Sequence, residues 1–199
     1  MPPSSFRPLP LCIEGIGRAL PERVVTAAEI EELCDLPAGW VLKRTGVSGD
    51  ETAISLGAEA AREALDDAGI APDEIDLLIN ASGTPFQPIP DNAAFFLEAL
   101  GLGQTGIPGF SVHATCLSFL PALNVAAQTL ASGQARRVLI VSSEAGACGL
   151  NFAEAESSAL MGDAAAAVVV SNLGDGQLES FWMETFGSGT RLSGISGGG

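Results

Sequence analysis

The chain has 199 residues, of which 47% are hydrophobic, and its formal net charge is −15 at pH 7. This size and composition suffice for one ordinary hydrophobic core. The acidic balance argues against nucleic-acid binding, which requires basic side chains to neutralise phosphates. No apolar run is long enough to span a membrane, and the N-terminus lacks the pattern of a signal peptide, so we expect a cytoplasmic protein.

The four cysteines are widely scattered and form no CxxC pair. Structural zinc is therefore not expected, and disulfides are not expected in a reducing compartment. We interpret Cys12 and Cys34 as small buried hydrophobic residues. No metal site is predicted.

Hydrophobic periodicity predicts strands that alternate with helices along the chain. Strands are expected at 11–19, 75–81, 137–143 and 164–171, and helices at 26–33, 52–68 and 93–100. Thr26-Ala-Ala-Glu29 is a capping box, and Gly69 is placed to end the second helix. Residues 177–186 are expected to pair with 164–171 as a hairpin across the glycines at 174–176. The alternation predicts a layered α/β domain with a mainly parallel sheet.

Cys116 stands between a predicted strand and a predicted helix. The residues before it are apolar and β-leaning, and those from Leu117 to Leu130 have helical apolar spacing. A thiol at such a junction lies at the positive end of a helix dipole, beside backbone N–H groups without an intrahelical partner. Both effects favour the nucleophilic thiolate. We therefore interpret Cys116 as a nucleophile rather than a buried structural cysteine.

Three other polar residues lie near these elements, and we expect them to have structural roles. His113 is close to Cys116 in sequence, but an odd spacing on a strand turns two side chains to opposite faces, and we expect a partly buried, hydrogen-bonded histidine. Asp163 is expected to fix the turn before its strand. Glu144, just past a core strand, would cap or bridge locally, and the sequence does not decide between these roles.

The chain divides into a domain at residues 1–186 and a glycine-rich tail or linker at 187–199. Five motifs in the first part resemble, in order, those of the ketoacyl synthase III-like enzymes of the thiolase superfamily. They are Leu20-Pro-Glu-Arg-Val-Val-Thr, Trp40-Val-Leu-Lys-Arg-Thr-Gly-Val47, Glu51-Thr52, Ala58-Glu-Ala-Ala-Arg-Glu-Ala-Leu65 and Leu160-Met-Gly-Asp-Ala-Ala-Ala-Ala-Val-Val-Val170. The Cys116-Leu-Ser-Phe motif is closest to the form found in OleA-type enzymes, which join two acyl-CoA molecules.

This resemblance implies the N-terminal half of a thiolase-like α/β fold, with a mixed, mainly parallel five-stranded sheet. It implies an acyltransferase in which Cys116 forms an acyl-enzyme from acyl-CoA or an acyl-carrier thioester, with no permanently bound cofactor. Trp40, Arg44 and Thr45 would contact the CoA end of the substrate, although a surface tryptophan packed beside a snorkelling arginine is the alternative. Since the chain is acidic, an anionic CoA site must depend on local cations or on a partner.

The sequence also departs from the family at two places. The family's catalytic histidine and asparagine belong to a second half, and the only histidine here is His113. The resemblance therefore implies a heteromer, in which a second chain supplies both residues. OleA-type enzymes also use a loop glutamate across the dimer interface, where this chain has Ile89 in Phe86-Gln-Pro-Ile-Pro-Asp91. Phe86 and Ile89 line a neighbouring subunit's acyl pocket or pack within their own loop, and both interpretations stay open.

The favoured hypothesis is a Claisen-type condensing subunit completed by a second chain. The first alternative is a non-catalytic or regulatory partner subunit that keeps the half-fold for its dimer surface. The second is a hydrolase that uses the same acyl-cysteine to release free acid.

Overall fold

The computed structural model describes residues 6–22, 26–37, 52–146 and 162–192. Its strands are β1 (Leu9–Pro10), β2 (Cys12–Ala19), β3 (Leu77–Asn80), β4 (Gly109–Ser111), β5 (Arg137–Ala145), β6 (Asp163–Ser171) and β7 (Gln177–Leu178). The α-helices are α1 (Ala27–Leu33), α2 (Ala53–Ala68), α3 (Asn92–Ala99) and α4 (Phe119–Ala131). Short 3-10 turns, η2 (Pro72–Glu74) and η4 (Gly187–Gly189), complete the described elements. The predicted alternation of strands and helices is confirmed.

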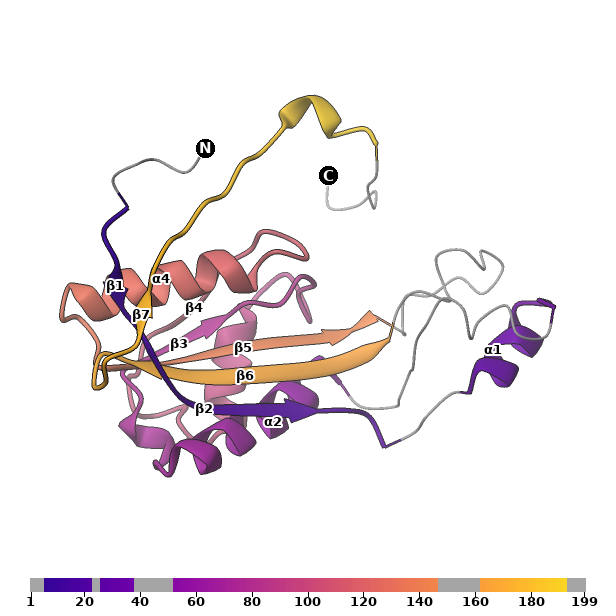
Figure 1. Ribbon diagram of the computed structural model, residues 1–199. Helices are drawn as coiled ribbons and strands as arrows, with labels where there is room; N and C mark the ends of the chain where they lie inside the picture. Colours follow the sequence, from indigo (N-terminus) through magenta and orange to yellow (C-terminus); the bar gives the residue numbers. More distant parts are fainter. Residues whose placement is uncertain (1–5, 23–25, 38–51, 147–161, 193–199) are drawn as a thin grey trace.

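A five-stranded sheet with the order β2-β6-β5-β3-β4 forms the centre of the molecule (Figure 1). β3 is parallel to both β4 and β5, whereas β6 is antiparallel to its neighbours β2 and β5. Four strands therefore run in one direction and β6 in the other. This confirms the predicted α/β class and the mixed, mainly parallel sheet.

Helices cover both faces of the sheet, α4 on one side and α2 with α3 on the other (Figure 1). Two clusters of buried side chains follow this division. One joins α2 and α3 to the sheet through Leu56, Leu65 and Phe96, and the other joins α4 through Ala122, Ala126 and Leu130. Because both faces are covered, β3 and the middle of β5 are continuously apolar rather than alternating.

Helix α2 begins and ends as its sequence predicts and packs very closely on β2. Thr52 accepts a hydrogen bond from Ser55 N at 3.1 Å, and Gly69 ends the helix with φ 67°, a conformation that favours glycine. Gly17 lets the two backbones meet, since a Cβ at that position would overlap the carbonyl oxygen of Ala60. The glycine is therefore needed for helix and strand to approach.

Two carboxylates of α2 cover the outer edge of β2. Asp67 accepts a hydrogen bond from Ile16 N at 2.9 Å, and Glu63 accepts one from Arg18 N at 2.6 Å. These N–H groups belong to the edge strand and point away from β6. The helix therefore satisfies donors that an edge strand ordinarily leaves exposed.

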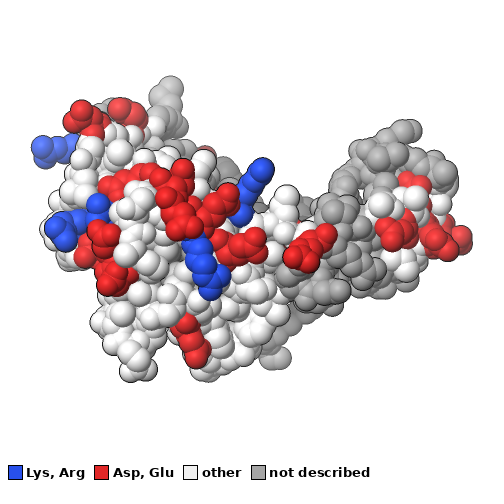
Figure 2. Space-filling view, turned by 90° about the horizontal axis from the view of Figure 1, so that it is seen from below, with Lys and Arg blue, Asp and Glu red and all other residues white. Residues whose placement is uncertain are grey.

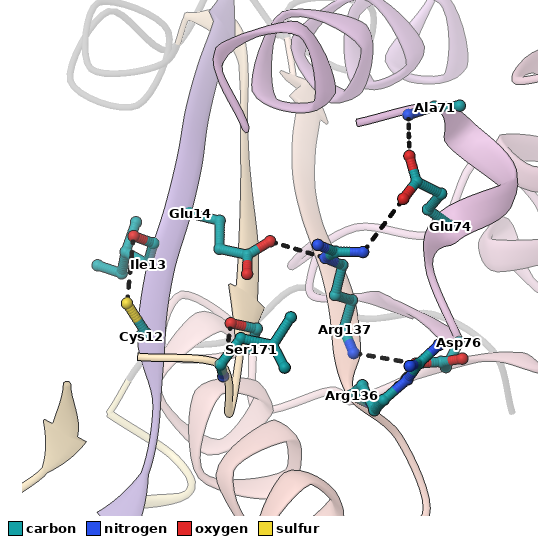
Figure 3. A network of polar contacts seen from close by, with 10 residues as sticks. Cys12, Ile13, Glu14, Ala71, Glu74, Asp76, Arg136, Arg137 and Ser171 are labelled. Carbon is teal, nitrogen blue, oxygen red and sulfur yellow. Dashed lines mark hydrogen bonds and ion pairs between the residues drawn. The ribbon is translucent and has the colours of Figure 1, made fainter. Parts of the chain in front are cut away.

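An ion network joins the start of β5 to the segment before β3 (Figure 3). Arg137 contacts Glu14 at 2.9 Å and Glu74 at 3.3 Å. Asp76 accepts hydrogen bonds from the backbone N–H groups of Arg136, at 2.7 Å, and Arg137, at 3.0 Å. In return Asp76 N donates to the Arg137 carbonyl at 2.9 Å, so β3 and β5 are tied at this end.

The predicted hairpin of 177–186 with 164–171 was wrong. β7 pairs with β1, in the register Leu9 with Leu178 and Pro10 with Gln177. β6 lies between β2 and β5, so it has no free edge for a hairpin partner. Beyond β7 the chain runs away from the sheet as an extended segment (Figure 1), on which Trp182, Met183 and Phe186 are exposed.

Candidate functional site

Cys116 is an exposed, free thiol in a tight turn that precedes α4. The helix begins at Phe119 rather than at Leu117 as predicted, so Cys116 lies three residues before it. Cys116 thus lies between a strand and a helix as predicted, in the turn between β4 and α4, but the predicted helix start was two residues too early. Because dipole effects fall off within a turn of the helix end, the local backbone decides how the thiol is presented.

Ser118 holds this turn together. Its hydroxyl donates to the Thr115 carbonyl at 2.6 Å and accepts from Ala114 N at 3.0 Å. Ser118 N donates to the same Thr115 carbonyl at 3.1 Å, and Ser118 is buried. Thr115 has a φ of 51°, a left-handed conformation that a β-branched residue seldom adopts. The backbone on the N-terminal side of Cys116 is therefore held in a strained, well-determined form.

A polar network follows the ends of β3, β4 and β5 next to this turn. Asn80 donates to the Ser111 hydroxyl at 2.7 Å and accepts from the Ser82 hydroxyl at 2.6 Å. Ser82 in turn accepts from Ser143 N at 3.0 Å, and Ser143 donates to the Ala53 carbonyl of α2 at 2.6 Å. Since the carboxyl ends of the parallel strands meet here, this edge of the sheet is rigid and polar.

Glu144 lies near the end of β5 and reaches the loop after β3. Its carboxylate accepts hydrogen bonds from Gly83 N, from Thr84 N at 3.1 Å and from the Thr84 hydroxyl at 2.6 Å. The structure thus resolves what the sequence left open, because Glu144 bridges two chain segments about sixty residues apart. Sequence reasoning had no signal for this, since its partners are one glycine and one threonine in a loop.

The loop of Phe86 and Ile89 presents apolar side chains to solvent. Ile89 is 84% exposed and Phe86 is 47% exposed. Phe86 meets Phe95 edge-on, with ring centroids 5.5 Å apart, and its backbone N donates to Asn92 Oδ1 at 2.9 Å. Phe86 is thus partly anchored to α3, whereas Ile89 projects from the loop.

Three predicted site residues lie outside the described part, and three predictions of burial need correction. Trp40, Arg44 and Thr45 are outside the described residues. His113 is exposed, so the prediction of a partly buried histidine was wrong. Cys12 and Cys34 are partly rather than fully buried, which corrects the expected burial.

On the described surface, acidic side chains gather on one face, which is unfavourable for binding an anionic substrate there. The face that α2 covers is studded with acidic side chains (Figure 2), and the helix itself carries Glu59, Glu63, Asp66 and Asp67 against Arg62. Over the described ranges, we find no cluster of three metal-ligating side chains and no helix long and apolar enough to cross a membrane.

Comparisons with known proteins place this fold and turn in a family. A family model described as 3-oxoacyl-[acyl-carrier-protein (ACP)] synthase III matches residues 110–187, which include Cys116 and its turn. The chain is 40% identical over 162 residues to β-ketoacyl-[acyl-carrier-protein] synthase III of Rhizorhabdus wittichii, covering 78% of this chain and 50% of that protein. The chain is thus similar to the N-terminal half of the ketoacyl synthase III-like proteins of the thiolase superfamily.

Further relatives match a similar share of this ketoacyl synthase III-like chain. The corresponding synthase of Chelativorans sp. is 37% identical over 164 residues, covering 79% of this chain and 50% of that protein. The crystal structure of 3-oxoacyl-[acyl-carrier-protein] synthase III from Aquifex aeolicus matches with a TM-score of 0.77 and 32% identity, covering 83% and 55%. An OleA structure from Xanthomonas campestris matches with a TM-score of 0.70 and 25% identity, covering 81% and 58%. The chain thus spans about half the length of the curated relatives it matches.

Proposed function

We propose that this ketoacyl synthase III-like chain is the nucleophile-bearing half of an enzyme that condenses acyl thioesters. The observation that carries the proposal is Cys116 itself, a free and exposed thiol on a turn held by Ser118, inside the segment that matches the family model. The curated relatives named above are β-ketoacyl-[acyl-carrier-protein] synthases by name, which supports this class of reaction.

In the proposed first step, the Cys116 thiolate attacks the thioester carbonyl of acyl-CoA or an acyl-carrier protein. A bond forms between Sγ and the acyl carbon, the bond from that carbon to the substrate's sulfur breaks, and the thiol leaves with a proton. Backbone N–H groups, that of Cys116 included, would stabilise the oxyanion of the tetrahedral intermediate. The product of this half-reaction is an acyl-cysteine.

The second step requires residues that we assign to another chain. A second acyl thioester must form a carbanion and attack the acyl-cysteine, which needs a base or a decarboxylation site. The family resemblance assigns this work to a histidine and an asparagine, and His113 does not fill the role because the family uses no histidine there. We therefore propose a heteromer in which a partner supplies both residues.

Substrate contacts in this proposal come from three places. Trp40, Arg44 and Thr45 would form the CoA entrance, with Arg44 providing a cation for the anionic substrate. Phe86 and Ile89, both exposed, would line the acyl pocket of a neighbouring subunit. The motif Cys116-Leu-Ser-Phe supports an OleA-type, head-to-head condensation as the finer assignment.

The test is the intact mass of the purified chain after incubation with acetyl-CoA and, separately, with decanoyl-CoA. We expect an increment of one acyl group, lost in Cys116→Ala and retained in Cys12→Ala, since Cys12 is also a free thiol. No increment with either thioester would contradict the proposal.

A second measurement separates the alternatives. When the histidine-bearing partner is added, a β-keto product that depends on Cys116 supports condensation. Unchanged product formation by Cys116→Ala in the assembled complex would instead identify a regulatory subunit. Free acid without any β-keto product would identify a hydrolase.

A further inference from the structure

We propose that Glu144 is a positioning residue for Cys116, acting through the loop of Gly83 and Thr84. This inference rests on the proposed function, in which Cys116 forms the acyl-enzyme. Glu144 is the penultimate residue of β5, where it pairs with Ala164 of β6, beyond the end of the β3 pairing at Val141. The carboxylate is therefore carried by a strand of the central sheet.

Both oxygens of this carboxylate are engaged by the loop after β3. Oε1 accepts from Gly83 N, and Oε2 accepts from Thr84 N and from the Thr84 hydroxyl. Hydrogen bonds to an ionised group are about twice as strong as those between neutral groups. Three of them on one side chain fix the loop relative to β5. With three hydrogen bonds to one loop, Glu144 is suited to hold that loop in place.

The loop touches the backbone of the residue that precedes Cys116. A Cβ built on Gly83 would lie 3.3 Å from Oε1 of Glu144 and 3.3 Å from the carbonyl oxygen of Thr115. Gly83 thus lies between the carboxylate and the Cys116 turn, and a Cβ there would be closer to both than ordinary van der Waals contact. Displacement of the loop therefore passes directly to Thr115.

Thr115 is the point at which the turn is most sensitive to displacement. Its left-handed φ of 51° is costly for a β-branched residue and persists only where the surroundings enforce it. The Ser118 hydroxyl donates to the Thr115 carbonyl at 2.6 Å, and Gly83 lies close to the same carbonyl. Glu144 thus holds the loop that supports the backbone next to Cys116.

Ser82 anchors the same loop independently. It is bonded to Asn80 at 2.6 Å and to Ser143 N at 3.0 Å, so the base of the loop stays in place without Glu144. Loss of the carboxylate should then release Gly83 and Thr84 while the sheet remains folded. This makes the positioning role separable from a role in stability.

The experiment compares Glu144→Gln with Thr84→Val in the full chain. Glutamine keeps the shape of glutamate but has one acceptor oxygen, so either Gly83 N or the Thr84 donors must face an amide NH₂ group. Thr84→Val removes one donor from an exposed side chain and leaves the carboxylate intact, so folding should be preserved. Glu98→Gln, an exposed glutamate of α3, is the control for removing one negative charge.

Two reactions of Cys116 are followed by site-resolved mass spectrometry. One is acylation by acetyl-CoA or decanoyl-CoA, whichever is faster with the wild type, and it requires an oriented thiol and oxyanion donors. The other is alkylation by iodoacetamide as a function of pH, which requires only an accessible thiolate. Since an ångström of misplacement can cost about 10²-fold in an oriented reaction, we expect acylation to fall about tenfold in Glu144→Gln and less in Thr84→Val.

Alkylation should be unchanged or slightly faster in both variants, because removing a nearby carboxylate does not disfavour the thiolate. Glu98→Gln should match the wild type in both reactions. Acylation within twofold of wild type in both Glu144→Gln and Thr84→Val would overturn the positioning role while the proposed function stands. Equal losses of acylation and alkylation would also overturn it, because they indicate general loss of structure. Absence of acylation in the wild type would overturn the proposed function and this inference with it.

Discussion

The two ends of the β3/β5 strand pair are tied by the same device, a carboxylate that binds two consecutive backbone N–H groups of the other segment. At one end Asp76, just before β3, binds Arg136 N and Arg137 N at the start of β5. At the other end Glu144, near the end of β5, binds Gly83 N and Thr84 N just after β3. The contacts span sixty or sixty-one residues in each case.

The surroundings of the two carboxylates differ. The Asp76 end is an ion network, in which Arg137 pairs with Glu14 and Glu74. At the Glu144 end, the described partners are backbone and hydroxyl groups, and the loop that they hold touches the turn of Cys116. The same device therefore ties two strands of the sheet at one end and holds the loop beside the Cys116 turn at the other. Changes at the first should lower stability, and changes at the second should lower reactivity.

The largest effect is expected from Gly17→Ala, which disturbs both ends at once. The new Cβ would overlap backbone atoms of Ala60 and Ala64, so α2 must move away from the sheet. Ala53 of this helix accepts the Ser143 hydroxyl beside the Glu144 end, so the disturbance reaches the site. We expect the free energy of unfolding to fall by about 3 kcal/mol or more.

Urea denaturation measures this loss, and Cys116 acylation should fall with it. Gly187→Ala is the control, because a Cβ there would meet no atom within 4 Å. A stable Gly17→Ala chain with wild-type acylation would show that helix and strand need not approach so closely.

The next largest effect is expected from Asp76→Ala, which removes the carboxylate at the end remote from Cys116. Arg136 N and Arg137 N lose their acceptor, and we expect a loss of about 2 kcal/mol because these groups are at most partly buried. Denaturant midpoints measure the loss. Acylation of Cys116 should stay within twofold of wild type, and a tenfold fall would mean that the two ends are not independent.

Arg137→Met removes the cation of the network but leaves its backbone hydrogen bonds. The Arg137 side chain is 22% exposed and that of Glu74 is 48% exposed, so solvent screens the pairs and we expect a loss of about 1 kcal/mol. The difference from wild type should shrink in high salt. Arg191→Met changes an exposed arginine and should be neutral. An Arg137→Met loss that high salt leaves unchanged would indicate packing rather than charge.

The smallest effect is expected from Asp76→Asn, the chemical counterpart of Glu144→Gln. A single oxygen of Asp76 serves both backbone donors, so an asparagine carbonyl can replace it, with a loss of about 0.5 kcal/mol from the missing charge. Thermal melting and acylation should both stay near wild type. A large loss of stability would show that the charge matters more than the acceptor geometry.

Much of the fold could be predicted because its signals are local. The capping box at Thr26 and the terminating Gly69 appear as expected, since each depends on residues within a few positions. The pairing of 177–178 could not be predicted in the same way. It depends on β6 already having two neighbours, which is a property of the whole sheet.

The candidate site likewise has a part that local sequence signals predict and a part that depends on distant contacts. Cys116 could be found from its place between a strand and a helix, although the strained Thr115 and the bonds of Ser118 delay the helix by two residues. The partners of Glu144 could not be foreseen, because Gly83 and Thr84 carry no chemical signal and lie far away in sequence. The predicted roles of Trp40, Arg44, Thr45, Phe86 and Ile89 stay predictions.

The edge of β2 has a consequence for how this chain meets other chains. Another polypeptide that tried to extend the sheet there would find Ile16 N and Arg18 N already bonded to Asp67 and Glu63. It would have to break two hydrogen bonds to charged groups before forming any of its own, and two carboxylates would face the incoming backbone carbonyls. The strand is thereby protected against the edge-to-edge growth that leads to aggregation.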